Sequence, residues 1–417
     1  MAKILVADKM EKHFAVSFAE QGHEVIWAEN VKPEELPQLM KGIDIIVARS
    51  KKILPATIEA GRGSLKAIIR AGSGVADIYN ESTKALLAEL GVTVSNTPGA
   101  NANATAQGAL VQLAKLLGVE GKETAPIDGL STMQHMIWAR NFDAASADAT
   151  QALATPDGKT KESKNKYRGD EVTIPGDFGK NNPFTGKKIL VIGSTGKVGS
   201  IVSGDLSRAG ATVVGFHSKS GPLAEIIGRE RPDIIMVHAE QNAKTKGMLG
   251  EKEFAVMKRG TLIVNNARPG LIDVAALKQA AESGIVAGVA LDAEVEKLRP
   301  YAGIKGLLVT PHTGSETHQA QMNTAMMTDK AIRTYSENGI MPHIVNAEDI
   351  ATQNLPKGMT LSQAKQVVAN RIVAIPGMDD PTQAAESLMA FDPFTFAAFA
   401  GGVSCIQTRH ALGVRGT

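Results

Sequence analysis

The stretch that decides the fold is ILVIGSTGKVGS, residues 189–200. Its first four residues are apolar and predict a buried strand, and the glycines that follow predict a tight turn before a helix. Glycine lets a backbone approach a bound group closely, and the start of a helix favours an anion. The predicted phosphate-binding turn consists of Gly193, Ser194, Thr195, Gly196, Lys197, Val198 and Gly199. By itself this pattern is a weak signal, since similar strings occur in tight turns without a function.

The strand that comes next strengthens the prediction of a dinucleotide site. In a dinucleotide-binding unit the second strand usually ends in an acid that binds the adenosine ribose. Here TVVGF, residues 212–216, is followed by His217, Ser218 and Lys219. An acid would repel a 2′-phosphate, whereas these three side chains can hydrogen-bond it. We therefore expect NADP as the cofactor. NAD is the alternative, in which case the three residues are surface loop and backbone groups hold the ribose.

Short apolar runs alternate with helix-length segments along the chain, which is typical of α/β domains with a parallel sheet. The first series of runs is KILVAD, EVIWAE, DIIVARS, KAIIRAGSG and VTVSNTPGA. The second is KILVIG, TVVGFHS, DIIMVHAE, TLIVNNAR, AGVALDA and LLVTPHTG. The pattern predicts two doubly wound, Rossmann-like domains of related architecture and a C-terminal extension. The family resemblance given below implies that they are a flavodoxin-like substrate domain and an NAD(P)-binding Rossmann domain.

The expected boundaries are 1–102 for the first part of the substrate domain, 103–315 for the cofactor domain, 316–346 for a return to the substrate domain and 347–417 for the extension. Residues 119–183 are rich in Gly, Pro, Lys and Asp and are expected to be a loop or insertion with one apolar island, MQHMIWARN. In the extension, TLSQAKQVVANRI predicts a helix with Thr360 and Gln363 as a capping box. The rings expected to pack in a core or a subunit interface are Phe391, Phe394, Phe396 and Phe399.

The composition argues against several classes of protein. The 417 residues include 45 Lys and Arg against 43 Asp and Glu, a formal net charge of +2. That balance argues against a nucleic-acid surface or a polybasic membrane surface. The first residues, AKILVADK, are typical of a strand rather than a signal peptide, and the apolar FTFAAFAGGVSC is too short to span a bilayer. The one cysteine, Cys405, forms no intrachain disulfide. We expect a cytoplasmic protein that binds a small molecule and no metal.

Charged side chains follow three strands of the second series. NNARPG, ALDAEVEK and TPHTGSETHQAQ each begin where an apolar run ends, and the cleft of an open α/β sheet lies at the carboxyl ends of its strands. They bring Arg268, Asp292, Glu294, Glu296 and His312. Together with a nicotinamide, these groups suit hydride transfer to a 2-oxo acid: Arg268 holds the carboxylate and His312 protonates the new alkoxide. Any one of them alone is more often a surface ion pair or a structural histidine, and their joint placement favours a site.

Six segments resemble the D-isomer-specific 2-hydroxyacid dehydrogenase family, and within it the phosphoglycerate dehydrogenases. They are RAGSGV, VSNTPGANANATAQ, LVIGSTGKVG, MKRGTLIVNNARPGLIDVAAL, SGIVAGVALD and VTPHTGSETHQAQ. The resemblance implies Arg268 as the substrate clamp, His312 as the acid/base and Asp292 on the nicotinamide carboxamide. It also implies backbone N–H groups around Ser73 and Gly74 on the substrate carboxylate, and a dimer formed through the cofactor domain. We further assign His238, Asn266 and Ala267 to the cofactor and Asn101 to the substrate.

The sequence departs from the family pattern at the catalytic acid. The family's Glu lies five residues after the Asp of the Leu-Asp pair, and that position is Lys297 here. A one-residue deletion would bring Glu296 to His312, which is the assignment we favour, and Glu294 is the alternative. A proline at position 269 follows the arginine where the family has glycine, which restricts the arginine to extended geometry.

The substrate is predicted from the stretch ARSKKI. Arg49, Ser50 and two lysines at the end of a strand suit a phosphate dianion, as an Arg-Ser pair does in phosphoglycerate dehydrogenases. A solvated charge run is equally common. The expected pair is 3-phosphoglycerate and phosphohydroxypyruvate, and the alternative is NADPH-dependent reduction of glyoxylate or hydroxypyruvate. The displaced Glu and the phenylalanine cluster also fit a dinucleotide-binding scaffold with little catalysis. We expect a homodimer or higher homo-oligomer.

Overall fold

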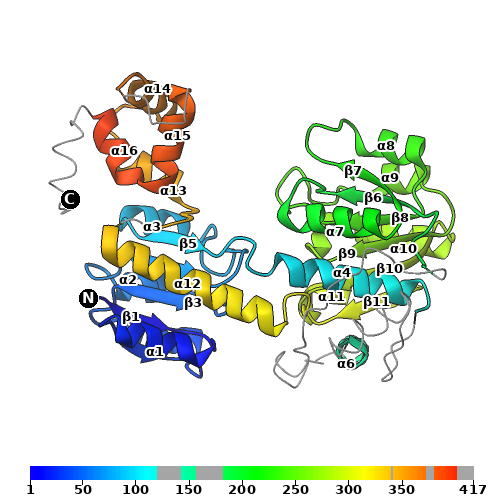
Figure 1. Ribbon diagram of the computed structural model, residues 1–417, viewed down its shortest axis with the longest axis horizontal. Helices are drawn as coiled ribbons and strands as arrows, with labels where there is room; N and C mark the ends of the chain where they lie inside the picture. The colour runs from blue at the N-terminus through cyan, green and yellow to red at the C-terminus, as the bar shows by residue number, and fades with distance from the viewer. Residues whose placement is uncertain (120–141, 156–181, 340, 372–379, 402–417) are drawn as a thin grey trace. The chain divides into compact units, whose positions relative to one another are not determined.

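The computed structural model describes residues 1–119, 142–155, 182–339, 341–371 and 380–401 (Figure 1). The chain divides into two compact units. The first unit comprises Met1–Ala100 and Met322–Thr417, and the second unit comprises Asn101–Gln321. These divisions lie near the expected boundaries after residues 102 and 315, and the C-terminal helices group with the first unit.

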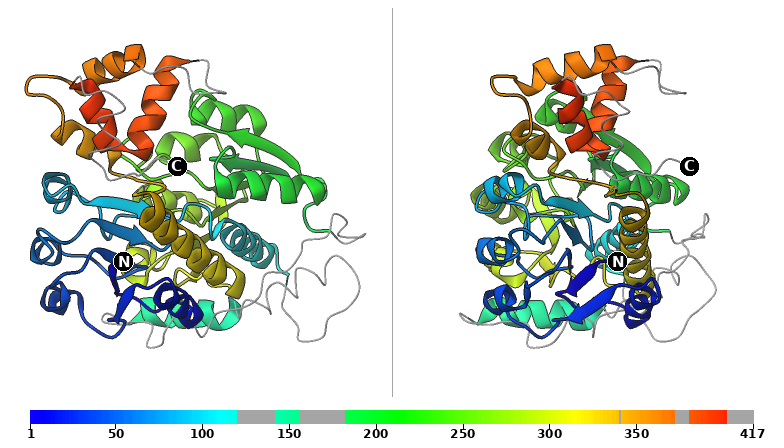
Figure 2. Two further views of the ribbon diagram at one scale, coloured as in Figure 1. Left: turned by 60° about the vertical axis from the view of Figure 1, so that its left-hand side comes forward. Right: turned by 90° about the vertical axis from the view of Figure 1, so that its left-hand side faces the viewer.

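The first unit is built on a parallel five-stranded sheet in the order β2-β1-β3-β4-β5. Its strands are β1 Lys3–Val6, β2 Glu24–Trp27, β3 Ile45–Ala48, β4 Ala67–Arg70 and β5 Thr93–Asn96. Successive side chains of a strand point to opposite faces, so the sheet has an apolar layer on each side. One layer contains α1 Lys12–Glu20 and α12 His318–Asn338, which lies across its face of the sheet in Figure 2. The other contains the 3-10 helix η1 Pro33–Leu39, α2 Pro55–Ala60 and α3 Lys84–Glu89.

The second unit contains a parallel six-stranded sheet in the order β11-β10-β9-β8-β6-β7. Its strands are β6 Lys188–Ile192, β7 Thr212–Phe216, β8 Ile234–Val237, β9 Thr261–Asn265, β10 Val286–Asp292 and β11 Leu307–Thr310. Helices α4 Ala102–Leu116 and α7 Lys197–Arg208 cover one face. The other face is covered by α8 Leu223–Glu230, α9 Glu251–Val256 and α10 Val274–Glu282. All eleven predicted strands form, and the α/β prediction is confirmed. The strand order reverses between β6 and β8, beside which ligands bind in such sheets.

Residues 119–183 are expected to be a loop or an insertion, and a loop throughout is wrong, because Phe142–Ala154 form helix α6. The buried residues of this helix recur at helical spacing: Phe142, Ala145, Ala149 and Ala152. The helix packs against β11. The composition averaged over residues 119–183 did not reveal this helix. Alanine, which favours helix, is concentrated in residues 142–154, whereas the Gly, Pro and Lys residues lie on either side of them in the sequence. The apolar island MQHMIWARN lies outside the described residues.

Four helices complete the first unit: α13 Ala347–Gln353, α14 Leu361–Arg371, α15 Pro381–Phe391 and α16 Pro393–Ala400. They enclose a small core that includes Val368, Met389 and the fully buried Phe396. The predicted capping box is confirmed. Thr360 N donates to Gln363 Oε1 at 2.8 Å, and Gln363 N donates to Thr360 Oγ at 3.3 Å.

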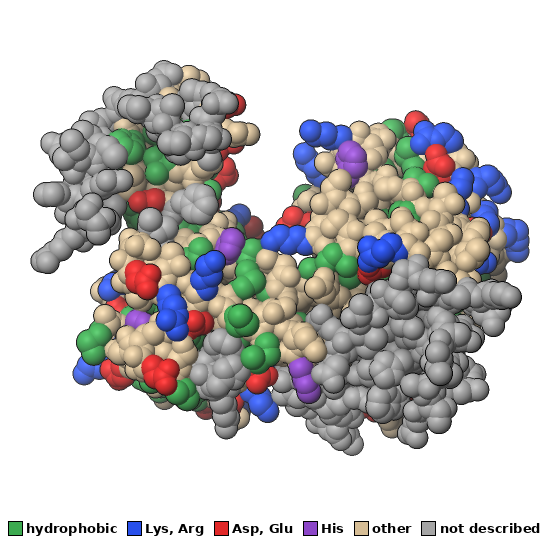
Figure 3. All heavy atoms as spheres, viewed as in Figure 1, with side chains coloured by type: hydrophobic (Ala, Val, Ile, Leu, Met, Phe, Trp, Pro, Cys, Tyr) green, Lys and Arg blue, Asp and Glu red, His purple; other side chains and the backbone are tan. Residues whose placement is uncertain are grey.

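The surface of the first unit mixes charges, with acidic and basic side chains interspersed on the face shown in Figure 3. Within the described ranges, no helix is both long and apolar enough to cross a bilayer. The same residues include no group of three or more His, Cys, Asp or Glu side chains placed to hold a metal ion.

Candidate active site

The glycine turn after β6 is closed against the end of β8. Gly193 has a φ of 82°, and a Cβ built on it would lie 2.7 Å from the carbonyl oxygen of His238. A Cβ on Gly199 would lie 2.2 Å from the carbonyl oxygen of Gly193. Only glycine fits at both positions. The turn leads directly into α7, which begins at Lys197, so turn and helix start form the cradle that a phosphate requires.

Two buried polar atoms at neighbouring strand ends have no hydrogen-bond partner among the described residues. They are His238 Nε2, after β8, and Asn266 Oδ1, after β9. Burial lowers the pKa of His238 to about 4, so its imidazole is neutral at pH 7. A buried polar atom left unpaired costs about 1–3 kcal/mol, so such atoms point to a missing ligand. The glycine cradle and these two atoms fit a nicotinamide dinucleotide, and Ala267 lies at the same edge.

The residues expected to select the cofactor follow β7. Gly193 N donates to Phe216 O at 2.8 Å, which keeps the end of β7 beside the glycine turn. Ser218 and Lys219 are exposed. His217 is half-buried, and its Nδ1 accepts from Lys219 N at 3.3 Å. None of these three side chains is a carboxylate, so none of them repels a phosphate ester.

The central contact of the site joins the ends of β10 and β11. His312 Nδ1 lies 2.6 Å from Glu294 Oε1. His312 has a left-handed backbone with φ 57°, and its N–H donates to Thr310 O at 2.9 Å. That conformation is uncommon for a residue with a side chain and persists only where the surroundings impose it. Burial alone would raise the pKa of Glu294. The hydrogen bond and charge of His312 outweigh burial and hold the pKa of Glu294 well below its usual value.

The prediction that Glu296 reaches His312 is wrong. Glu294 immediately precedes helix α11, Val295–Leu298, and has an extended backbone. Glu296 lies in the first turn of α11 and is exposed. Lys297 binds the other oxygen of Glu294, with 3.1 Å between Nζ and Oε2. Spacing in the sequence could not show this, because the start of the helix sets the direction of each side chain.

Asp292, at the end of β10, organises the turn that carries the histidine. The residue is 3% exposed. Its Oδ1 accepts from Thr313 N at 2.8 Å and from Thr310 Oγ at 2.5 Å, and its Oδ2 accepts from Gly314 N at 2.8 Å. Gln112 on α4 extends this network, since its Nε2 donates to Thr310 Oγ at 2.9 Å. The sequence pointed to Asp292 but gave no role to Thr310, the first residue of the stretch TPHTGSETHQAQ, or to Gln112, which lies outside the quoted segments.

Arg268 follows β9 and is exposed, with no carboxylate partner among the described residues. Its backbone is extended, with φ −146° and ψ 133°, as the proline after it requires. Asn265 Nδ2 donates to Arg268 O at 2.8 Å, and the Tyr301 hydroxyl donates to Pro269 O at 2.6 Å. Arg268 Nη1 donates to Ala267 O at 2.7 Å. The segment is therefore braced while the guanidinium keeps donors for a carboxylate.

The predicted phosphate loop after β3, in the first unit, is organised by an acid that the sequence analysis missed. Asp8 Oδ2 accepts the backbone N–H groups of Arg49 at 2.6 Å, Ser50 at 2.9 Å and Lys51 at 2.9 Å. Lys51 Nζ donates to the carbonyls of residues 28, 29 and 31 at 2.8, 3.1 and 2.6 Å. These N–H groups and this lysine are thus used within the protein, while Ser50 is exposed.

The other predicted substrate residues lie at two different places in the chain. Ser73 and Gly74 follow β4, the neighbour of β3. Ser73 Oγ accepts from Gly99 N at 3.3 Å, and Ser73 O accepts from Asn96 Nδ2 at 2.7 Å. The structure therefore brings this loop and the loop after β3 to one edge of the first sheet. Asn101 is the first residue of the second unit and precedes α4.

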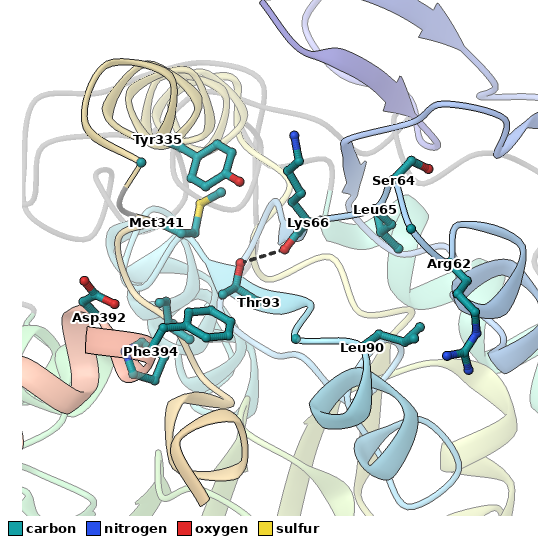
Figure 4. Close-up of a pocket in the computed structure, with 15 residues that line it drawn as sticks. Arg62, Ser64, Leu65, Lys66, Leu90, Thr93, Tyr335, Met341, Asp392 and Phe394 are labelled. Atoms are coloured by element: carbon teal, nitrogen blue, oxygen red, sulfur yellow. Dashed lines mark hydrogen bonds between the residues drawn. The ribbon is translucent and has the colours of Figure 1, made fainter. Parts of the chain in front are cut away.

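The first unit also has a cavity of about 400 Å³, between β4–β5, the end of α12 and the start of α16 (Figure 4). Its lining includes Leu65, Leu90, Met341 and Phe394. Phe394 is one of the predicted cluster of rings, and the ring of Phe391 lies outside the described side chains. The ammonium of Lys66 at this cavity is paired with Asp44 at 2.8 Å. None of the predicted catalytic residues lines the cavity.

Comparisons with known proteins find similarity to one family of dehydrogenases. The family described as "D-isomer specific 2-hydroxyacid dehydrogenase, NAD binding domain" matches residues 158–314. A D-3-phosphoglycerate dehydrogenase of Methanocaldococcus jannaschii is 27% identical over 391 residues, which are 90% of this chain and 65% of that protein. This chain thus spans less than two thirds of the length of that curated relative.

Two solved structures share the fold. A 3-phosphoglycerate dehydrogenase of Entamoeba histolytica with bound NAD⁺ has a TM-score of 0.57 at 22% identity, covering 82% of this chain and 98% of that one. A glyoxylate reductase of Paecilomyes thermophila has a TM-score of 0.58 at 21% identity, with coverage of 82% and 98%. At these identities the likeness establishes the fold alone.

Proposed function

We propose that the chain is a D-isomer-specific 2-hydroxyacid dehydrogenase, which transfers a hydride between a nicotinamide cofactor and a small D-2-hydroxy acid or 2-oxo acid; the match of that family's NAD-binding domain to residues 158–314 supports the proposal. The observation that carries this proposal is the 2.6 Å contact between His312 Nδ1 and Glu294 Oε1. Arg268 lies at the end of β9, next in the sheet to β10, so an acid/base pair and a carboxylate clamp share one edge of the second sheet.

The roles of the residues follow from their contacts. When bound, the cofactor supplies the hydride that adds to the carbonyl carbon of the 2-oxo acid. Arg268 pairs with the substrate carboxylate through its guanidinium donors. Glu294 fixes His312 through Nδ1, so Nε2 gives its proton to the oxygen of the new alkoxide. In the oxidative direction the same Nε2 accepts the hydroxyl proton.

Our proposal for the cofactor is NADP in preference to NAD. It is supported by the exposed Ser218 and Lys219 and the half-buried His217 at the end of β7, where an acid would otherwise bind the ribose. The seven residues of the glycine turn would hold the phosphates. His238 and Asn266, with their unpaired atoms, and Ala267 would line the nicotinamide side.

For the substrate we propose 3-phosphoglycerate and phosphohydroxypyruvate, supported by Arg49 and Ser50 after β3 and by the function named for the Methanocaldococcus relative. Ser73, Gly74 and Asn101 would assist in binding it. One observation favours glyoxylate or hydroxypyruvate instead. Asp8 uses three backbone N–H groups of the predicted phosphate loop and adds a negative charge there.

The test is oxidation of NADPH and, separately, NADH by the purified protein with phosphohydroxypyruvate, hydroxypyruvate and glyoxylate. Turnover that His312→Ala abolishes would support the enzyme. Dinucleotide binding without turnover on any of the three acids would favour the scaffold protein. The homo-oligomer and the cytoplasmic location stay predictions.

A further inference from the structure

We propose that the cavity of the first unit (Figure 4) binds a small organic amine, a molecule with an ammonium group at one end and an apolar body. None of the predicted catalytic residues lines this cavity, so the proposal goes beyond the proposed function and does not depend on it. Two observations on the described residues carry it. The cavity has apolar walls, and its lining leaves two oxygens unused, on Asp392 and Tyr335, while its cations already have partners.

The cavity has the size and the walls of a small-molecule site. Its volume of about 400 Å³ lies within the range of roughly 300–1,000 Å³ in which such sites fall. Its apolar lining comes from the segments before β4 and β5, from the chain after α12 and from the start of α16: Leu65, Leu90, Met341 and Phe394. A Cβ built on Gly91 would lie 3.3 Å from Cζ of Phe394, so this ring rests on the backbone of the turn before β5. The apolar body of a ligand would therefore meet a wall that is already in place.

The two cations of the described lining are neutralised by carboxylates. Lys66 Nζ lies 2.8 Å from Asp44 Oδ1. Arg62 donates to Glu59 Oε1 at 2.6 Å and to Glu89 Oε1 at 3.0 Å. An anionic ligand would have to compete with these acids for the two cations. The cavity is therefore unfavourable for a carboxylate or a phosphate.

Two oxygens of the lining remain available to a ligand. The hydroxyls of Ser64 and Thr93 each donate to a backbone carbonyl at 3.2 Å. Asp392 Oδ1 accepts from Thr395 N at 2.9 Å and caps α16, whereas its Oδ2 has no hydrogen bond or ion pair with any described residue. The hydroxyl of Tyr335 also has no hydrogen-bond partner in the described ranges, and burial raises its pKa, so it is neutral at pH 7. The cavity thus offers one charged acceptor and one neutral hydroxyl.

An ammonium group matches these two oxygens. It has three N–H donors and a positive charge, so it can pair with Asp392 Oδ2 and donate to the Tyr335 hydroxyl. Figure 4 shows Asp392, Met341 and Tyr335 on the same side of the cavity. Aromatic faces such as that of Phe394 also attract a cation. A carboxylate in the same place would be repelled by Asp392, so the charge of this residue selects the sign of the ligand.

The experiment uses the full chain and three probes that share one ring: 2-phenylethylamine, the uncharged 2-phenylethanol and the anionic 3-phenylpropionate. Ligand-observed NMR titration at pH 7 gives the dissociation constants, and thermal unfolding shows that each variant is folded. Asp392→Asn removes the charge but keeps a side chain that caps a helix. Tyr335→Phe removes the hydroxyl alone. The matched control is Asp380→Asn, since Asp380 Oδ1 caps α15 in the same way, accepting from Thr382 N at 2.8 Å, and does not line the cavity.

We expect the wild type to bind 2-phenylethylamine about tenfold more tightly than 2-phenylethanol, and 3-phenylpropionate more weakly than either. Asp392→Asn should remove the preference for the amine, and Tyr335→Phe should weaken the amine about threefold. Asp380→Asn should bind all three probes like the wild type. Equal binding of amine and alcohol, tighter binding of the carboxylate or no binding of any probe would overturn the proposal. Equal losses in Asp392→Asn and Asp380→Asn would also overturn it, because the amine would then be attracted by acidic side chains in general.

Discussion

In each of the two sheets, an acid at one strand end holds the loop after the neighbouring strand. Of these two loops, the one in the second unit also places a histidine beside a glutamate. In the first unit, Asp8 accepts three backbone N–H groups of the loop after β3, the strand beside β1. In the second unit, Asp292 at the end of β10 accepts two N–H groups of the loop after β11, its neighbour, and the hydroxyl of Thr310. An acid at one strand end thus shapes the loop of the next strand in both units.

The two loops differ in how their polar groups are used. After β3, Lys51 donates to three backbone carbonyls and the N–H groups are used. After β11, His312 is held with a positive φ beside Glu294, and the strand ends on the same edge leave atoms of His238 and Asn266 unpaired. Strain and unpaired buried atoms are costs that a bound ligand can offset. The histidine held beside an acid, which the loop after β3 lacks, favours the second unit for the proposed acid/base step.

Removing the histidine should have the largest effect. We expect His312→Ala to lower kcat by roughly 10²- to 10⁴-fold, the usual contribution of a positioned acid/base. Binding of the reduced dinucleotide should be unchanged, because the glycine turn and β7 are untouched. Steady-state kinetics and fluorescence titration measure the two quantities. A variant that kept most of its kcat would refute the assignment.

The two loop-holding acids should differ in their contribution to stability. Asp292 is buried, so Asp292→Ala removes the acceptor of three hydrogen bonds, two of them buried, and should cost about 3 kcal/mol of unfolding free energy. Asp8 is only half-buried and water can replace it, so Asp8→Ala should cost about 1 kcal/mol. Urea unfolding gives the totals, and hydrogen exchange of the two loops localises them. Equal costs would contradict the contrast between the units.

Glu294 should govern the pH dependence of the reaction. Its pKa lies below its usual value, so the carboxylate stays charged across the neutral range and loses its charge only when the pH falls through that lowered pKa. In Glu294→Gln the charged acceptor beside His312 Nδ1 is replaced by a neutral amide, so the imidazole is held less firmly. We expect reduction to slow about 10- to 100-fold at neutral pH and to lose the dependence on pH that the titration of Glu294 causes. The matched control is Glu296→Gln, which should leave the profile of kcat/KM in place.

The cofactor preference gives a smaller and more specific test. Replacing Ser218 and Lys219 with Asp and Glu should weaken NADPH binding about tenfold or more, since acids repel the 2′-phosphate, while NADH binding changes little. The titrations should be done in one buffer, because the effect is screened by salt. Equal losses for the two dinucleotides would mean that backbone groups hold the ribose.

Much of the fold could be predicted because it depends on local patterns. Every strand coincides with an apolar run, and three glycines predict the glycine turn.

The site could be predicted only in part. The sequence analysis favoured Glu296 over Glu294, because spacing alone does not show where α11 begins, and that start decides which side chain meets His312. Asp8 was missed because its partners lie more than forty residues along the chain. Helix α6 was missed because the composition was averaged over a longer segment.

The smallest effect is expected at His23 in the first unit. The residue is 7% exposed, and its Nδ1 accepts from Ala2 N at 3.1 Å. Burial and the nearby N-terminal charge lower its pKa below 6.5, against the opposing charge of Asp329. The folded state therefore disfavours the charged ring. The unfolding free energy should be level above pH 6.5 and fall as the pH drops from 6.5 through the lowered pKa.

His23→Gln removes the charge change and should flatten that part of the curve. The difference between the two proteins isolates His23 from His238 in the second unit, whose pKa burial also lowers. Urea unfolding between pH 5 and pH 8 measures both curves. Parallel curves would mean that protonated His23 is tolerated at the start of β1. In that case the buried histidine of the second unit, with its unpaired Nε2, would be the one that makes the fold sensitive to acid.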